Sequence, residues 1–283
     1  MRFFLILFFL WLSFLASSPV RGQAFVPDSV AWVDSVLQSL TLEQKIAQLL
    51  NIRAYSNRDE VYAQSIDSII LKYNIGGLTF FQGGPIRQAH LTNRWQKLAC
   101  TPLFIAIDAE TGVGMRLDSV PPFPDPMTLG AANDDSLTYR IGQAIGRQCR
   151  RLGIHINFAP VADVNNNPLN PVINQRSFGE DPVRVARLAE MMTRGIQSQG
   201  VIATLKHFPG HGDTDSDSHY TLPVIRKDKE TLEQTEFLPF LHNAGIAHAV
   251  MTAHLFVPSL DSSQGIPTSL SPPVVQEIGR AHV

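Results

Sequence analysis

The most informative part of the sequence for the fold is residues 201–219, VIATLKHFPGHGDTDSDSH, where an apolar run passes directly into a loop rich in titratable groups. Val201–Phe208 is apolar on both faces until its last few residues, as a strand inside a helix-covered parallel sheet requires. The prolines and glycines of FPGHG then interrupt regular structure and predict a long exposed loop. Such a strand would carry Lys206 and His207 to its carboxyl end.

Other short apolar runs along the chain have the same character, and helical patterns separate them. These runs cover Leu49–Ala54, Ile75–Phe81, Pro102–Asp108, Ile156–Asp163 and His248–Phe256. Between the strand candidates lie amphipathic stretches such as the one containing Leu137, Ile141 and Ile145, whose spacing places their side chains on one helix face. Repeated strand and helix predicts an α/β fold with six visible strands.

The polar residues that follow these strands distinguish two α/β architectures. They are Asp108, Asp163, Lys206, His207 and His254, at the carboxyl ends of different predicted strands. A barrel gathers functional groups from many strands at that edge, whereas an open doubly wound sheet binds ligands at one switch point. No GxGxxG or Walker sequence follows the first strand. We therefore predict a (β/α)8 TIM-type barrel, incomplete here, with about six βα units present.

The two ends of the chain do not fit the barrel pattern. The segment MRFFLILFFLWLSFLASS has one arginine, a short apolar run and small residues, so residues 1–22 are predicted to be a secretory signal peptide, with an uncleaved anchor as the alternative. Cleavage would leave no stable membrane insertion and a secreted or periplasmic protein. The last residues, 278–283, resemble a translated sequencing adapter and are treated as foreign. Residues 28–277 are then a truncated barrel domain.

Composition narrows the choice of ligand. The chain has 283 residues, 44% hydrophobic and 17% charged, with a formal net charge of -2. Such values describe a globular protein without a broad basic face, which argues against nucleic acid as a partner and favours a small neutral or mildly acidic ligand. Cys100 and Cys149 could form one disulfide, but Cys149 falls in a helical pattern, so we expect two buried free thiols.

Asp217 and His219 are the candidate acid/base pair. They are two residues apart, so in an extended segment their side chains would project to the same side. A carboxylate beside an imidazole stabilises the imidazolium, which can give a proton to a leaving oxygen and later take one from water. Alternatively, the loop is simply solvated, or its His and Asp side chains bind zinc or calcium.

The same loop carries a family resemblance. KHFPGHGDTDSDSH resembles the signature of the family 3 glycoside hydrolases, in the β-N-acetylglucosaminidase branch. The similarity continues through IDAETGVGMRL, FAPVADVNNNPLNPVINQRSFGEDP and VMTAHLFVPSLD, in the family's order, and covers residues 40–275. One departure is Thr111, which stands where the family often has the first glycine of D-x-E-G-G, at a position expected to shape the rim of the pocket.

The resemblance assigns roles residue by residue. Sugar hydroxyls would be held by Asp108, Arg116, Arg176, Lys206 and His207. His219 would be the general acid/base, with Asp217 orienting and charging it. Asp163 and His254 are left as structural or supporting groups. No metal ligand is assigned.

Some of these residues also have purely structural interpretations. Arg176 could form a surface ion pair with the acidic residues of GEDP, Arg116 could pair with Asp118, and Asp108 could cap a helix. His207 is harder to explain in this way, because a histidine buried after a strand costs free energy unless it is hydrogen-bonded.

The resemblance implies a retaining exo-β-N-acetylglucosaminidase that removes terminal β-linked N-acetylhexosamine, with peptidoglycan fragments as a candidate source. The mechanism would be double displacement, without metal or cofactor. The family's nucleophilic aspartate lies on a segment after the position of Leu270 and Ser271 that this chain lacks, so the chain as given is expected to be inactive. The alternatives are a metal-dependent hydrolase that uses the His and Asp loop, and a non-catalytic sugar-binding protein.

Overall fold

The computed structural model describes residues 29–218 and 220–280. The predicted signal peptide at 1–22, the candidate acid/base His219 and residues 281–283 lie outside the described residues. The chain divides into two compact units, residues 1–41 and 42–283. In the first unit the structure describes the helix α1 (Ser29–Ser39), and the sheet and the candidate site belong to the second.

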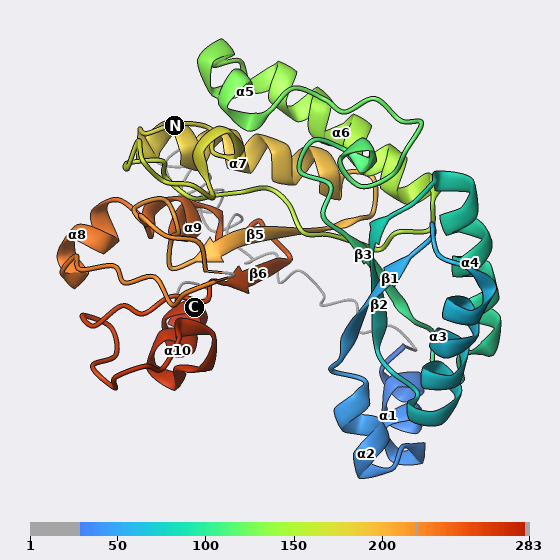
Figure 1. The fold of residues 1–283 in the computed structure, drawn as a ribbon. Helices are drawn as coiled ribbons and strands as arrows, with labels where there is room; N and C mark the ends of the chain where they lie inside the picture. The colour runs from blue at the N-terminus through green and yellow to red at the C-terminus, as the bar shows by residue number, and fades with distance from the viewer. Residues whose placement is uncertain (1–28, 219, 281–283) are drawn as a thin grey trace, which may run out of the picture. The chain divides into compact units, whose positions relative to one another are not determined.

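The second unit is built on a parallel sheet whose strands follow one another in chain order (Figure 1). The strands are β1 (Asn51–Tyr55), β2 (Gly77–Gln82), β3 (Phe104–Ile107), β4 (Ile156–Asn157), β5 (Ile202–Phe208) and β6 (Ala249–Thr252). Every neighbouring pair is parallel, with Asn51 opposite Gly77 and Gly77 opposite Phe104 at the first two junctions. The order never reverses as it does in a doubly wound sheet. The predicted α/β barrel-type fold, with six parallel strands present, is confirmed.

Helices separate the strands. The α-helices of this unit are α2 (Leu42–Ala47), α3 (Glu60–Tyr73), α4 (Pro85–Leu98), α5 (Pro126–Ala132), α6 (Asp135–Arg151), α7 (Pro182–Gln197), α8 (Lys229–Gln234), α9 (Leu238–Asn243) and α10 (Pro272–Arg280). Short 3₁₀ turns are η1 (Val113–Met115), η2 (Asn174–Arg176) and η3 (Thr268–Leu270). Helices α3, α4, α6 and α7 pack along the outer side of the strands (Figure 1).

Helix α6 follows from its sequence. Asp134 caps it by accepting a hydrogen bond from the backbone N–H of Leu137 at 2.9 Å, which satisfies one of the donors left free at a helix start. Ile141, Ile145 and Cys149 then lie on the buried face. This stripe is the helical pattern predicted from the sequence, and it directs α6 against the adjoining core and α7.

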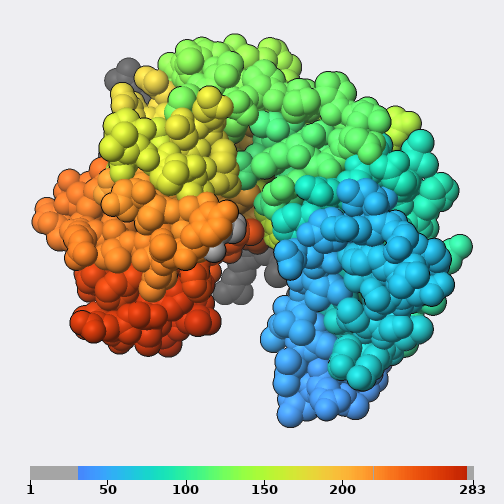
Figure 2. All heavy atoms as spheres, viewed as in Figure 1, coloured from blue at the N-terminus to red at the C-terminus, as the bar shows by residue number. Residues whose placement is uncertain are grey.

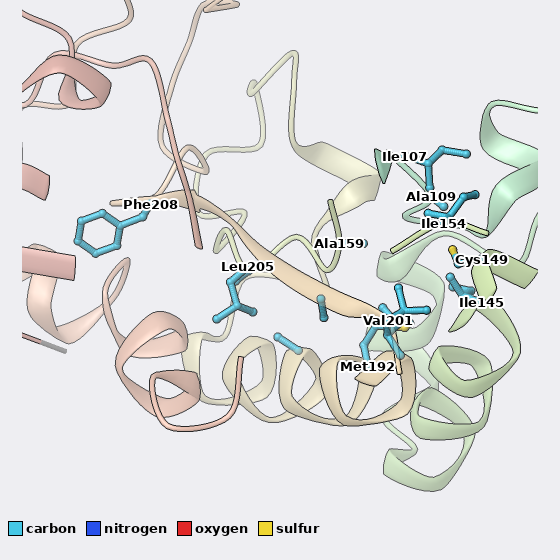
Figure 3. Close-up of a cluster of buried hydrophobic side chains, with 14 of the residues drawn as sticks. Ile107, Ala109, Ile145, Cys149, Ile154, Ala159, Met192, Val201, Leu205 and Phe208 are labelled. Atoms are coloured by element: carbon cyan, nitrogen blue, oxygen red, sulfur yellow. The ribbon is translucent and has the colours of Figure 1, made fainter. Parts of the chain in front are cut away.

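The core between the helices and the sheet is apolar and closely packed. Figure 3 shows Met192 of α7 next to Val201, just before β5, with Ile145 and Cys149 of α6 nearby. Met192 and Leu205 are almost completely buried. Burying side chains of this size stabilises the fold by about 1.5–3 kcal/mol each. This packing fixes the position of β5, which carries Lys206 and His207.

The cysteines only partly match the expectation. Both are free, but Cys149 is buried while Cys100 is exposed. Cys100 follows the carboxyl end of α4, where the chain turns at the surface, so the prediction of two buried thiols was wrong for this residue. Burial raises the pKa of the Cys149 thiol to about 12. Among the described helices, none combines the length and apolar character needed to cross a membrane.

Candidate active site

A cavity of about 640 Å³ lies at the carboxyl ends of the strands. Its walls come from early strands and from β5 and β6, and Figure 2 shows the hollow between the blue and cyan atoms of the former and the orange and red atoms of the latter. The residues predicted to hold a sugar all line it: Asp108, Arg116, Arg176, Lys206 and His207. The structure thus brings these five residues together, while their roles toward a ligand stay predictions.

Lys206 joins the two carboxylates of the cavity floor. Its Nζ lies 2.9 Å from Asp108 Oδ1 and 2.6 Å from Glu110 Oε1. The Lys206 side chain is only 2% exposed, and a buried ammonium requires such compensation because leaving water is costly. Both carboxylates lie just beyond β3, so the contact links the ends of β3 and β5.

Arg176 completes the pairing of Glu110. Its Nε and Nη2 donate to the two carboxylate oxygens at 2.9 and 2.8 Å, a bidentate geometry that fixes both groups. Burial alone would raise the pKa of Glu110, but attraction to Lys206 and the bonds from Arg176 outweigh it and lower that pKa to about 2. Glu110 therefore stays ionised at neutral pH and is not a proton donor for catalysis.

Arg116 extends this network to the cavity wall. Its Nη2 lies 3.1 Å from Asp108 Oδ2, and its guanidinium lies over the Phe81 ring at 5.1 Å from the centroid. A cation in this position is attracted to the ring face, which holds the side chain in place. Arg116 Nε is buried and has no partner in the described part of the chain. A ligand oxygen could satisfy a donor of this guanidinium.

Asp163 orients His207. The carboxylate is fully buried, accepts a hydrogen bond from the His207 backbone N–H at 3.1 Å, and lies 2.7 Å from His207 Nδ1. Burial by itself would raise the pKa of Asp163, but His207 and the backbone N–H of His211 lower it. An ionised Asp163 places the proton on Nδ1 and leaves Nε2 as the ring nitrogen available to a ligand. The sequence left Asp163 as a structural or supporting group, and in the structure it orients His207.

His211 also reaches the cavity, and it restrains the loop that follows β5. Burial lowers its pKa, so the imidazole is neutral near pH 7. Its Nδ1 lies 2.8 Å from Thr214 Oγ1 and its Nε2 lies 3.1 Å from Ser218 Oγ. Ser218 lines the cavity as well. The loop therefore returns to the cavity one residue after Asp217.

The segment around Asp217 differs from the expectation of an extended strand. The backbone N–H groups of Tyr220 and Thr221 both donate to the Asp217 carbonyl at 3.1 Å, so the chain turns after Asp217. Asp217 does not appear among the cavity-lining residues, and His219 lies outside the described residues. The direction of the two side chains relative to each other, like the role of the pair, therefore stays a prediction.

The purely structural roles considered for Arg176, Arg116 and Asp108 are not found in the structure. Arg176 pairs with Glu110, and Asp118 pairs with Arg87 at 2.6 Å instead of with Arg116. Asp108 bonds Lys206 and Arg116 and caps no described helix. These residues are held toward the cavity.

Sequence reasoning missed Glu110 and His211 as site residues. Glu110 was present in the quoted DAETG motif, two residues after Asp108 at the same strand end, and that position was the available signal. His254 lines the cavity, with Nδ1 2.8 Å from Ser269 Oγ. Over residues 29–218 and 220–280, no group of three or more His, Cys, Asp or Glu side chains is placed to hold a metal ion.

Comparison of the sequence with known protein families gives a match over most of the chain. Residues 41–283 match the family described as "Glycosyl hydrolase family 3 N terminal domain", and the chain belongs to this family. Beta-hexosaminidase A of Pseudoalteromonas piscicida is 40% identical over 214 residues, 70% of this chain and 36% of that protein. Beta-hexosaminidase LpqI of Mycobacterium tuberculosis is 34% identical over 270 residues, 90% of this chain and 65% of that protein.

A solved structure shares the fold and a substantial part of the sequence. It is a glycoside hydrolase family 3 beta-N-acetylglucosaminidase from Paenibacillus sp. str. FPU-7, with a TM-score of 0.77 and 38% identity. The alignment covers 86% of this chain and 47% of that one. The chain thus spans between 36% and 65% of the length of the two curated relatives.

Proposed function

We propose that the natural protein is a retaining exo-β-N-acetylglucosaminidase that hydrolyses terminal β-linked N-acetylhexosamine. The proposal rests on the position of Lys206, which is buried at the cavity floor between Asp108 and Glu110. The chain that carries it belongs to glycosyl hydrolase family 3. Relatives of this chain are named as β-hexosaminidases and a β-N-acetylglucosaminidase.

The cavity groups suit a sugar ring. Asp108 accepts hydrogen bonds from hydroxyls, while Lys206 and Arg116 donate to them, and each such bond is charge-assisted and therefore strong. Glu110, itself held by Arg176, binds Lys206 from the other side. Bonds of this kind strengthen as the ring flattens toward an oxocarbenium-like transition state, which lowers the barrier to cleavage.

Proton transfer falls to Asp217 and His219 in this proposal. Because Glu110 and Asp163 are kept ionised, neither can protonate the departing oxygen at neutral pH. His219 would donate a proton in the first step and accept one from water in the second. The attacking carboxylate corresponds, by the family resemblance, to an aspartate on a segment later than Ser271, so each kinetic experiment uses the natural full-length protein.

The cellular setting is part of the proposal. Residues 1–22 have the charge, apolar run and small residues of a signal peptide, which would send the enzyme to the periplasm or outside the cell. Its proposed substrates there are glycans with terminal β-linked N-acetylglucosamine, including peptidoglycan fragments.

The direct test is hydrolysis of p-nitrophenyl N-acetyl-β-D-glucosaminide by the full-length protein, followed by NMR of the first-formed sugar. The β anomer appears first if the reaction proceeds with retention. Asp108→Asn should lower kcat/KM by about a hundredfold or more, because a charged acceptor of a sugar hydroxyl is lost. Glu233→Gln, a surface change on α8, serves as the control. First release of the α anomer, or activity abolished by a chelator, would contradict the proposal.

Replacement of His219 by alanine tests the proton donor. Hydrolysis of a substrate with a poor leaving group should fall by about 10²–10⁴-fold, whereas a dinitrophenyl glycoside, which needs little protonation, should lose much less. Rates for the two substrates, measured side by side in wild type and variant, give the comparison. Equal losses for both leaving groups would remove His219 from this role.

A further inference from the structure

The loop that carries Asp217 is closed at its base by a lysine that the proposed catalytic steps do not use. Lys227 Nζ lies 3.2 Å from Asp213 Oδ2, near the start of the loop. The same Nζ lies 2.5 Å from Glu236 Oε1, beyond α8. Lys227 thus joins the two ends of the segment that contains Asp217.

Glu236 gives Lys227 a fixed anchor. Its side chain is completely buried, accepts a hydrogen bond from Asn166 Nδ2 at 2.7 Å, and is also bonded by the Thr235 hydroxyl. Gly210 packs so closely that a Cβ there would lie 2.7 Å from the Glu236 side chain. A buried carboxylate with this many partners has one available position, and the ammonium it binds is placed with it.

Both ends of the loop are held by further contacts. On the upstream side, Gly212 packs directly on the Val164 carbonyl, where an added Cβ would lie 1.7 Å from the oxygen. On the downstream side, Ile225 N donates to Phe256 O at 2.9 Å, and Phe256 N donates to Pro223 O at 2.8 Å. The pair between Asp213 and Lys227 connects these two anchored ends.

We propose that Asp213 and Lys227 are positioning residues for the proposed glycosidase reaction. Their ion pair restrains the loop so that the Asp217 segment stays beside the cavity, which the loop reaches at Ser218. The effect of this ion pair on catalysis rests on the proposed function. The restraint itself is a property of the fold and can be measured without substrate.

Asp213→Ala is the decisive variant, because it removes the loop side of the bridge and leaves the buried pair of Lys227 and Glu236 intact. Lys227→Met is unsuitable, since a buried carboxylate without its partner strongly destabilises a protein. Asp213→Glu keeps the charge and should retain the restraint. Glu233→Ala is the matched control, because it removes an exposed ion pair of similar kind, the one between Glu233 and Lys229 at 3.8 Å on α8.

The first readout is amide hydrogen exchange in the full-length protein. Peptides within residues 214–222 should exchange about three- to fivefold faster in Asp213→Ala, the range expected for losing one partly exposed ion pair. Exchange within α7 should not change, and Asp213→Glu and Glu233→Ala should behave as wild type. Unchanged exchange of residues 214–222 in Asp213→Ala would overturn the proposed restraint.

The second readout separates positioning from general destabilisation. In Asp213→Ala, kcat for a poor leaving group should fall several times more than kcat for a dinitrophenyl glycoside, while KM stays near the wild-type value because the sugar contacts remain. Asp213→Glu should recover kcat. Faster exchange with unaltered kcat would overturn the positioning role. An inactive wild-type enzyme would instead contradict the proposed function, and the exchange result would still decide whether the restraint exists.

Discussion

Glu110 illustrates how single side chains set the chemistry of this cavity. Its side chain is 3% exposed, and an isolated carboxylate at such a depth would be neutral. Lys206 and Arg176 reverse that tendency and lower its pKa to about 2. The two cations are in turn compensated by Glu110 and Asp108, so the cavity floor carries ionised groups without an uncompensated carboxylate.

This pKa makes stability depend on pH in a defined direction. A carboxyl whose folded-state pKa is below the ordinary 4.5 contributes stability above pH 4.5 and loses it as pH falls toward 2. Wild type should lose about 2 kcal/mol more than Glu110→Gln between pH 6 and pH 3. Urea unfolding at both pH values measures the difference, with Glu233→Gln as the control. Parallel losses in wild type and Glu110→Gln would show that Glu110 is not held ionised.

Part of this site could be predicted from sequence at the residue scale. Asp108, Lys206 and His207 lie at the ends of apolar runs, and parallel strands bring their carboxyl ends to one edge. Arg116 and Arg176 lie on connecting segments and were found only through the family resemblance. The strand-end position of Glu110 was a usable signal, but its pairing with Arg176 was not, because a single sequence does not tell which acidic residue an arginine will bind.

At the scale of elements, the apolar runs predicted all strands of the sheet, but not their lengths. The run Ile156–Asp163 yields only Ile156–Asn157 as regular strand. Pro160 has no backbone N–H, so the regular ladder cannot continue through it, although Val161 still pairs with Lys206 as an isolated bridge. The run identified the strand but not its end, because the regular strand stops at Asn157, three residues before Pro160.

The contact between α6 and α7 depends on glycine. A Cβ on Gly195 of α7 would lie 2.4 Å from the Tyr139 carbonyl oxygen and 2.9 Å from Gly142 Cα, both in α6. Gly195→Ala should therefore destabilise the protein by about 1–3 kcal/mol, because two helix backbones must separate. Thermal and urea unfolding of wild type and variant measure this change in the free energy of unfolding. Gly245→Ala, at a site with nothing within 4 Å, should be close to neutral, and equal effects at both sites would refute close helix packing as the cause.

At the scale of the sheet-bearing unit, the site is assembled from distant parts of the chain. Lys206 and Asp108 are 98 residues apart, and Arg176 and Glu110 are 66 apart. Strand order brings them to the same edge, which a barrel-type prediction anticipates. Their distances depend on loop paths and side-chain packing, and those are not encoded in local sequence patterns.

Ligand binding should stabilise the whole molecule. If the cavity binds the terminal sugar, N-acetylglucosamine at about one hundred times its Kd should stabilise the full-length protein by about 2.7 kcal/mol, since it binds only the folded state. Thermal unfolding with increasing sugar measures this. The shift should be greatly reduced in Asp108→Asn and in a galactose control. An equal shift in wild type and Asp108→Asn would place the sugar elsewhere.

We propose that the network of Asp108, Lys206 and Arg116 holds the sugar ring of the substrate. A crystal structure of the full-length protein with N-acetylglucosamine tests it most directly. The sugar is predicted to lie in the cavity, with its hydroxyls within about 3.2 Å of Asp108 Oδ and Lys206 Nζ. A sugar bound outside this cavity, or inside it without contact to either residue, would contradict the account.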